Sequence, residues 1–356
     1  MKIALVLHKY GVPLDDPCSF PLGFMYVSAV LKEQGHTVKV LNYNLWEYDF
    51  VNEVAGCDVV MFTGFEEFKP YIIRDAEVCD DLGIKTVLGG ALATFKPQEM
   101  LQHVDTVVVG EGEEVLTRAL NAPGVIYGGR PDLDRLPLPD YEGFGIEEYH
   151  RRNGFKHIGV LTSRGCPHSC TFCAHTCHYQ CRKLSAVMDE IAAYRQQYGI
   201  EHVVINDNTL NGSKGRFRAF CNEMGKSGLS WTAALRLDNL DESLVELAKS
   251  AGLVYTVVGV ESMRQSDLDR YNKGISVEQV ERGLALLEKH HIGYMGNLLV
   301  ETINDLERNR PFLERYNLFP APVMRFVGTA VDSAVDGGLV EICRQYIQSR
   351  GLAFNA

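Results

Sequence analysis

The 356-residue sequence lacks the features of a membrane-spanning, exported or nucleic-acid-binding protein. It has no run of about 18 uncharged apolar residues, which argues against a transmembrane helix. The apolar run within residues 1–8 is too short for a signal peptide and is followed by no small-residue cleavage site. Positive charge is in deficit: the net charge is −11 at pH 7, which disfavours non-specific binding to nucleic acid or anionic membranes. We therefore expect a cytoplasmic protein with neither nucleic acid nor a membrane as partner.

Low-complexity segments are also absent, and the length suits two domains of ordinary size. Cysteine, by contrast, is abundant, with ten residues in the chain. Because nothing indicates export, metal binding or catalysis explains them better than disulfides do. Five of them are clustered in the sequence, at Cys166, Cys170, Cys173, Cys177 and Cys181.

Short apolar runs alternate with helical patterns over residues 1–130, which predicts βαβ units and a parallel sheet. We expect strands over 2–8, 38–43, 58–63, 86–88 and 106–109, and helices over 22–34 and 70–82. Ligands of such sheets bind at the carboxyl ends of the strands. The residues that fall there are His8, Thr63, Gly64, Gly89, Gly90 and Gly110. The fold class predicted is α/β, with a Rossmann-like parallel-sheet domain over residues 1–130.

A second alternating series follows a proline-rich stretch that we interpret as an interdomain linker over 131–150. Strands are expected over 159–162, 202–205, 231–235, 255–260, 292–300 and 323–327, separated by helical stretches. Six such strands predict a partial (β/α)6 barrel over 151–330. Residues 331–356 are expected to form a closing helix and tail.

Three cysteines of the cluster, Cys166, Cys170 and Cys173, are spaced C-x3-C-x2-C just after the first strand of this second domain. Iron–sulfur clusters are usually held by four cysteines, so three thiolates on one loop would leave one iron open to another ligand. The alternative is a structural zinc loop completed by Cys177 and Cys181, or by His175 or His178, although zinc usually takes ligand pairs on separated elements.

The loop, with Phe172 directly before its last cysteine, resembles the signature of the radical S-adenosylmethionine (SAM) superfamily. Further resemblance covers residues 158–302, with polar residues at successive strand ends and the motif 272–274. It implies a [4Fe–4S] cluster on the three cysteines and reductive cleavage of SAM to a 5′-deoxyadenosyl radical. The residues expected to contact SAM are Phe172, Asp207, Arg236, Glu261 and Asn297. Each polar one could instead be a helix cap or a surface partner.

The first domain resembles the cobalamin-binding domain that precedes the catalytic domain in one class of radical SAM enzymes. The matching stretches are 21–23, 35–38, 88–91, 109–113 and the proline-rich linker. The resemblance implies a corrin pocket formed by His8, Thr63, Gly64, Gly89, Gly90 and Gly110, where glycine lets the backbone approach a bulky ligand. The Asp-x-His-x-x-Gly motif is absent, and residues 64–68 are bulky and acidic. A Rossmann-like domain that has lost its cofactor is the alternative.

Together the resemblances imply a cobalamin-dependent (class B-like) methyltransferase acting on an unactivated carbon or a phosphinate centre. A small-molecule or peptide substrate and an electron donor such as flavodoxin or ferredoxin are the partners expected. One alternative is a radical SAM enzyme of rearrangement, cyclisation or oxidation with a vestigial cobalamin domain. A non-catalytic iron–sulfur carrier or sensor is another.

Overall fold

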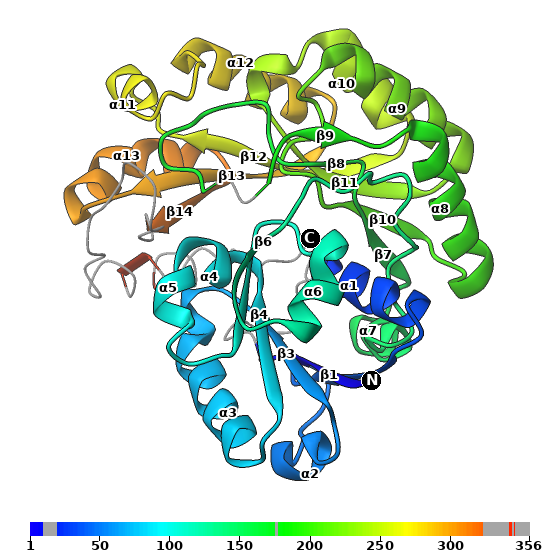
Figure 1. The fold of residues 1–356 in the computed structure, drawn as a ribbon. Helices are drawn as coiled ribbons and strands as arrows, with labels where there is room; N and C mark the ends of the chain where they lie inside the picture. The colour runs from blue at the N-terminus through cyan, green and yellow to red at the C-terminus, as the bar shows by residue number, and fades with distance from the viewer. Residues whose placement is uncertain (10–19, 175–176, 323–341, 344, 346–356) are drawn as a thin grey trace. The chain divides into compact units, whose positions relative to one another are not determined.

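The computed structural model describes residues 1–9, 20–174, 177–322, 342–343 and 345, which fall into two compact units (Figure 1). Unit 1 consists mainly of residues 1–155 and unit 2 mainly of residues 156–356. In the described residues no helix is long and apolar enough to cross a membrane.

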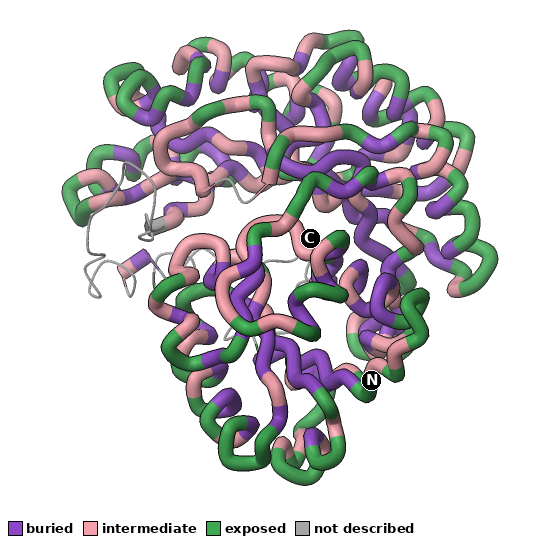
Figure 2. The backbone as a smooth tube through the Cα atoms, viewed as in Figure 1, coloured by how far each residue is buried: buried purple, intermediate pink, exposed green. Residues whose placement is uncertain are grey.

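The described part of unit 1 is built on a six-stranded, fully parallel sheet in the order β2-β1-β3-β4-β5-β6. Its four central strands are rich in β-branched residues and buried on both faces, as expected where helices cover a parallel sheet (Figure 2). The strand order reverses between β1 and β3, which lie side by side. Ligands of open α/β sheets bind outside the carboxyl ends of the strands at such a point. The strands are β1 (Lys2–Leu7), β2 (Thr37–Asn42), β3 (Val59–Thr63), β4 (Lys85–Gly89), β5 (Thr106–Val109) and β6 (Gly124–Tyr127).

Helices α1 and α3 carry the apolar residues that cover this sheet. From α3, Ile72, Ala76 and Cys79 enter the same buried cluster as the strand residues Val60 and Phe62. The helices of unit 1 are α1 (Leu22–Glu33), α2 (Phe50–Val54), η1 (Glu66–Phe68), α3 (Lys69–Asp81), α4 (Gly90–Phe95), α5 (Pro97–Met100), η2 (Glu113–Val115), α6 (Leu116–Asn121) and α7 (Ile146–Asn153).

The stretch interpreted as a linker over 131–150 is not an extended connection, and this prediction was wrong. It packs into unit 1, where Tyr141 and Phe144 are each only 1% exposed. Asn42, at the end of β2, donates a hydrogen bond to the carbonyl of Phe144 and another to the hydroxyl of Tyr149 on α7. The prolines are confined to 131–139, and the aromatic residues that follow bury enough apolar surface to hold the chain on the sheet domain.

The described part of unit 2 contains a second parallel sheet of six strands, in the order β14-β13-β12-β11-β10-β7. One face of its central strands is buried by aromatic packing, for example of Trp231 on β11 against Phe217 and Phe220 on α9. On the opposite face, alternate residues of β12 and β13 are only half-buried. The sheet strands are β7 (His157–Val160), β10 (His202–Ile205), β11 (Ser230–Leu235), β12 (Leu253–Glu261), β13 (Gly293–Val300) and β14 (Leu318–Pro322).

Helices alternate with these strands, which confirms the predicted order of elements. They are α8 (Leu184–Tyr198), α9 (Lys214–Ser227), η3 (Leu237–Asn239), α10 (Glu242–Ser250), α11 (Gln265–Arg270), α12 (Val277–Lys289) and α13 (Ile303–Arg315). The sixth strand described is β14, whereas the strand predicted over 323–327 and the closing helix and tail predicted over 331–356 lie largely outside the described residues. A small antiparallel ribbon of β8 (Ser163–Arg164) and β9 (Gln180–Cys181) completes unit 2.

Candidate functional site

The cysteine loop leaves the sheet of unit 2 just after β7 and is closed at its base by the ribbon of β8 and β9. In the ribbon, Ser163 pairs with Cys181. Arg182 strengthens the closure, because its amide N–H donates to the carbonyl of Thr162 at 2.9 Å and its guanidinium to the carbonyl of Leu161 at 2.9 Å. A second cation, Arg216 on α9, donates to the Thr162 carbonyl at 3.0 Å. The two ends of the loop are therefore fixed to each other and to the sheet.

Asp207, which follows β10, holds the start of this loop. Its carboxylate accepts four hydrogen bonds: from the amide and hydroxyl of Thr162, both at 2.6 Å, and from those of Ser163, at 2.9 and 2.7 Å. Four donors saturate a carboxylate, and the side chain is 4% exposed. The geometry favours Asp207 as an anchor of the loop, whereas the sequence predicted a contact with SAM.

The three thiols of the loop, of Cys166, Cys170 and Cys173, are half-buried and close enough to act on one another electrostatically. Burial, helped by the neighbouring thiols and the Glu261 carboxylate, raises the pKa of Cys173 to about 11. Burial also raises the pKa of Cys166, against the amide N–H of His168 and the charges of Arg236 and Lys273. The site is thus made of soft sulfur donors with cations nearby, which suits an iron–sulfur cluster.

A single-zinc site receives no support from the described residues. Among them, no three His, Cys, Asp or Glu side chains converge closely enough to hold one metal ion. A cluster has a looser requirement, since each thiolate binds a different iron. Cys181 lies on β9, where its thiol contacts the Tyr179 hydroxyl at 3.3 Å. His175, one of the alternative zinc ligands, lies outside the described residues.

Residues 270–272, at the end of α11, hold the distal part of the loop. The carbonyl of Tyr271 accepts the amide N–H of Thr171 at 2.9 Å, and the carbonyl of Arg270 accepts the Thr171 hydroxyl at 3.2 Å. The Asn272 amide donates to the carbonyl of Ser169 at 2.9 Å. The loop is therefore tied down on both sides, at Thr162–Ser163 by Asp207 and at 169–171 by this segment.

Arg236, at the end of β11, lies within electrostatic reach of Cys166 and Cys170. Its guanidinium makes two 3.0 Å bonds to the Asp238 carboxylate and donates to the carbonyl of Lys273 at 2.8 Å. It is only 6% exposed. Arg236 therefore supplies positive charge beside the thiols from a fixed position.

Glu261 ends β12 and forms a buried ion pair with Lys273, whose ammonium lies 2.8 Å from the carboxylate. Gly259 makes room for the pair: a Cβ there would lie 2.3 Å from the Glu261 carboxylate and 2.5 Å from the Lys273 ammonium. The backbone of Glu261 has φ +63°, a strained value for a residue with a side chain. Such over-determined geometry is concentrated at functional sites.

Phe172 and Asn297 complete the set predicted to contact SAM. The Phe172 ring meets Tyr271 edge-on at 5.5 Å between centroids, and the Lys273 ammonium lies 5.8 Å from its centre. Asn297 is half-buried and shares the face of the sheet on which Gly259 lies, since the two are paired in register. The Asn297 side chain makes no hydrogen bond to any described residue, so it is available to a ligand.

In unit 1, glycines occupy the ends of β3, β4 and β5. Gly90 has φ +81°, and a Cβ on it would lie 2.5 Å from the Thr63 hydroxyl, so a side chain there is excluded. Added Cβ atoms at Gly89 and Gly110 would meet no protein atom within 4 Å. The hydroxyl of Thr94 joins two of these ends: it donates to the Gly90 carbonyl at 2.8 Å and accepts the Gly110 amide N–H at 3.0 Å. The edge is a backbone cradle, which suits a bulky ligand.

His8, at the end of β1, is less open than the sequence predicted. It is 5% exposed and its Nε2 lies 2.9 Å from the buried carboxylate of Asp75 on α3. Aromatic rings surround it, with centroids of Phe62 and Tyr71 at 6.0 and 6.1 Å. His8 is thus part of the wall beneath this edge of the sheet. Gly64 also faces inward, because a Cβ there would lie 2.9 Å from Phe68.

Sequence reasoning missed several residues of the site. Asp75 and Tyr271 were not singled out, and Lys273 and Glu301 were noted only as parts of motifs. Their contacts join segments 12 to 100 residues apart, from Lys273 with Glu261 to Tyr271 with Thr171. Lys273 could have been found only by predicting that its cation is buried, because a buried charge needs a partner.

Comparison with known families assigns both units. The family described as "B12 binding domain" matches residues 16–120, and the "Radical SAM superfamily" matches residues 160–309. An uncharacterized methyltransferase of Pyrococcus horikoshii is 24% identical, over 89% of this chain and 79% of its own length. An anaerobic magnesium-protoporphyrin IX monomethyl ester cyclase of Rubrivivax gelatinosus is 27% identical (83% and 62%). A cytidylyl-2-hydroxyethylphosphonate methyltransferase of Streptomyces wedmorensis is 25% identical (69% and 62%). The chain thus spans less than two thirds of the last two relatives.

Solved structures share the fold. The radical SAM methyltransferase TsrM of Kitasatospora setae superposes with a TM-score of 0.70 at 18% identity, covering 90% of this chain and 72% of TsrM. The cobalamin-dependent radical SAM enzyme OxsB superposes with a TM-score of 0.71 at 19% identity, covering 88% and 52%. The three-thiol loop after β7 and the glycine-rich strand ends of unit 1 lie within the two matched domains. The chain therefore carries a B12-binding domain over residues 16–120 ahead of a radical SAM domain over residues 160–309.

Proposed function

We propose that the chain is a cobalamin-dependent radical SAM methyltransferase that alkylates an unactivated carbon or a phosphinate centre. The observation that carries the proposal is the pairing of two edges in one chain. One is a thiol loop fixed beside buried cations in unit 2, and the other is the glycine-rich strand edge of unit 1, where the backbone is open at Gly89 and Gly110. Methyltransferases among the relatives support it.

Cys166, Cys170 and Cys173 would hold the cluster, which when bound supplies the electron that cleaves SAM. The chain's own residues then have distinct tasks. Asp207 fixes the start of the loop, and Arg236 and the Glu261–Lys273 pair place charges where the amino acid part of SAM can meet them. Asn297 offers a free amide on the half-buried face of the sheet.

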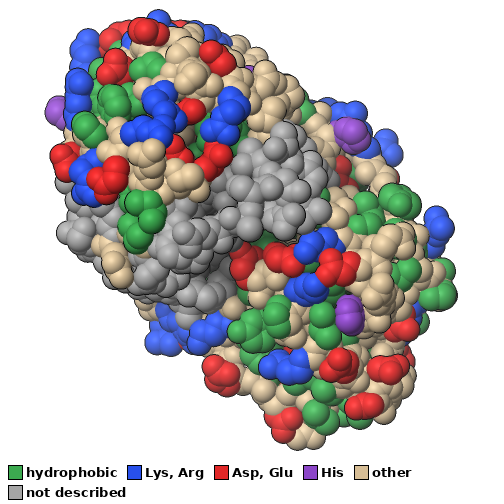
Figure 3. All heavy atoms as spheres, turned by 90° about the vertical axis from the view of Figure 1, so that its left-hand side faces the viewer, with side chains coloured by type: hydrophobic (Ala, Val, Ile, Leu, Met, Phe, Trp, Pro, Cys, Tyr) green, Lys and Arg blue, Asp and Glu red, His purple; other side chains and the backbone are tan. Residues whose placement is uncertain are grey.

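In unit 1, Gly89, Gly90 and Gly110 would form the floor of the corrin site, with Thr63 and Gly64 below them and His8 in the wall. Cobalamin, when bound, supplies the carrier of the methyl group. The corrin ring of cobalamin is large, so a pocket floor made of backbone without side chains is the feature that the site needs. Among the described residues on the face drawn in Figure 3, acidic and basic side chains are interspersed. The substrate we propose is a small molecule or a peptide.

Product analysis tests this function. Protein reconstituted with iron, sulfide and cobalamin is given SAM and a chemical reductant, which stands in for a flavodoxin or ferredoxin donor of the cytoplasm. A methyltransferase yields both S-adenosylhomocysteine and 5′-deoxyadenosine, the former only when cobalamin is present. 5′-Deoxyadenosine alone contradicts methyl transfer. That result favours ring closure or oxidation, the second candidate, which the cyclase relatives support.

A further inference from the structure

A hydrogen-bonded group beyond the residues already assigned connects the cysteine loop to two strand ends. At its centre is Tyr271, which is 3% exposed. Its carbonyl holds the amide of Thr171 and its ring packs edge-on against Phe172. Tyr271 therefore contacts the loop by backbone and by ring, between Cys170 and Cys173.

The hydroxyl of Tyr271 points away from the loop, to the end of β13. It donates a 2.5 Å hydrogen bond to the carboxylate of Glu301. Burial, and then this bond, raise the pKa of Tyr271, so the hydroxyl stays protonated and remains a donor. The carboxylate is in turn held by Arg270, whose two terminal nitrogens lie 2.5 and 3.2 Å from its oxygens. This pairing lowers the pKa of Glu301 and keeps it ionised.

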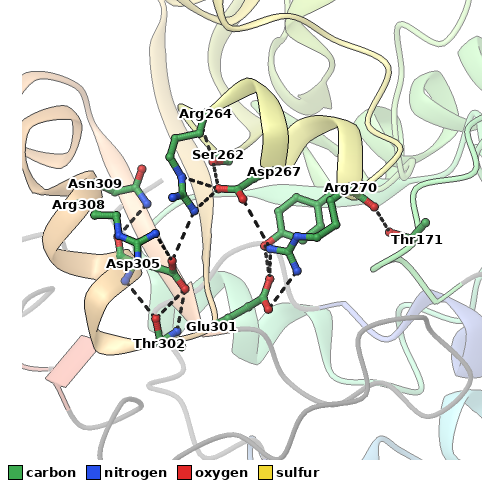
Figure 4. Close-up of polar contacts among 11 residues, drawn as sticks. Thr171, Ser262, Arg264, Asp267, Arg270, Glu301, Thr302, Asp305, Arg308 and Asn309 are labelled. Carbon is green, nitrogen blue, oxygen red and sulfur yellow. Dashed lines mark hydrogen bonds and ion pairs between the residues drawn. The ribbon is translucent and has the colours of Figure 1, made fainter.

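The same group reaches β12 through Asp267 on α11 (Figure 4). One oxygen of Asp267 lies 3.7 Å from Arg270, and the other accepts the hydroxyl of Ser262, directly after β12, at 2.9 Å. Arg264 bonds the same carboxylate and lies 3.5 Å from Asp305, in the first turn of α13. Groups that follow β12 and β13 or lie in the first turn of α13 thus all contact the short segment 264–271.

We propose that Tyr271 and Glu301 are positioning residues that fix the cysteine loop relative to the ends of β12 and β13. The bond between them transmits the position of β13 to Thr171 and Phe172, and so to Cys170 and Cys173 on either side. This inference rests on the proposed radical SAM chemistry, in which the open iron must face SAM bound at these strand ends. A loop released from Glu301 would hold the cluster but present it less accurately.

Tyr271→Phe is the sharpest test, because it removes the hydroxyl and leaves the ring on Phe172. Tyr294→Phe is its matched control: Tyr294 lies on β13, is also buried, at 7% exposed, and its hydroxyl donates to Glu288, outside the loop, at 2.8 Å. In full-length cluster-loaded protein, we expect Tyr271→Phe to lower kcat for SAM cleavage or raise its KM by about 10-fold, as small misplacements of reacting groups do. Tyr294→Phe should change neither by more than about 2-fold.

Two further readouts do not depend on turnover. Hydrogen exchange of the peptide over 166–174 should be faster in Tyr271→Phe by about 10-fold, the effect of losing one hydrogen bond. In Tyr271→Phe, a higher concentration of SAM should be needed to change the electron paramagnetic resonance spectrum of the reduced cluster. Glu301→Gln, which keeps an acceptor for the hydroxyl, should lie between wild type and Tyr271→Phe.

Wild-type exchange over 166–174 and a wild-type spectral response in Tyr271→Phe would overturn the positioning role. The same holds if Tyr294→Phe alters both to the same degree. Failure of the proposed function is recognised separately: wild-type protein would then bind the cluster without cleaving SAM, while the exchange difference between the two tyrosine variants still decides the positioning role.

Discussion

The carboxyl edges of the two parallel sheets are built from opposite materials. In unit 1 the edge is backbone: Gly89 and Gly110 have open space where a Cβ would be. In unit 2 it is buried charge: Asp207, Arg236 and Glu261 each end a strand or follow one, and each is held by hydrogen bonds or an ion pair. A sheet edge can thus serve a large ligand by leaving side chains out, or a charged one by fixing them in place.

The largest effect is expected from the cluster ligands of unit 2. Cys170→Ala should abolish formation of 5′-deoxyadenosine, because a cluster short of one thiolate is not held. The control is Cys221→Ala, a buried thiol of α9 in the same unit that is remote from the loop in its contacts. Iron content and deoxyadenosine measured together decide the point: SAM cleavage by a fully loaded Cys170→Ala protein would refute the assignment.

Asp207→Asn should damage the charged edge next. The Asn side chain would place an NH2 donor opposite groups that are themselves donors, namely two hydroxyls and two backbone N–H groups. A buried donor left without an acceptor costs about 1–3 kcal/mol. We expect a lower free energy of unfolding, measured by chemical denaturation, and weaker retention of iron. Asp241→Asn, at the exposed N-cap of α10, provides a control of the same chemistry. Equal behaviour of the two variants would show that Asp207 is no anchor.

Gly89→Ala tests the backbone edge without disturbing the fold. Because the added methyl meets no protein atom within 4 Å, the melting temperature should not fall. If the corrin lies over this backbone, cobalamin retention should fall about tenfold, or about 1.4 kcal/mol. Gly23→Ala, on α1 and equally unobstructed, is the control. Undiminished cobalamin binding by Gly89→Ala would place the ligand elsewhere.

The smallest effect concerns the opposite, amino end of the unit 2 strands, where His202 begins β10. Burial lowers the pKa of His202 from 6.5 to about 4. The unfolded chain therefore binds a proton more readily between these values, so stability should fall as pH decreases through this window and be unaffected by His202 above it. In His202→Gln the loss of melting temperature between about pH 7 and pH 5 should be smaller. An unchanged loss would mean that His202 is not buried as a neutral ring.

The order of elements could be predicted from the sequence because it depends on local patterns. The runs over 106–109 and 202–205 are continuous apolar strands, and the structure has β5 and β10 at those residues. Strand β6 and helix α7 were missed, since short segments near prolines carry weak periodic signals and form only against a completed sheet.

The site divides in the same way. The spacing of the three cysteines is a local feature of the sequence, and the site could be predicted from it directly, although their role as ligands stays a prediction. The partners of Asp207 and Glu261 could not be predicted, because which groups they meet is set by the register of β7, β10 and β12. The hydrogen bond of Glu301 with Tyr271 could likewise not be predicted, since only the folded chain brings the two residues together.

The central claim is that one chain holds both an iron–sulfur cluster and cobalamin. Its most direct test is the content of iron, sulfide and cobalamin in protein purified without oxygen after reconstitution with all three. We expect about four irons per chain and one retained cobalamin. A protein that keeps its iron but releases all cobalamin would contradict the account of unit 1, and one that keeps neither would contradict both.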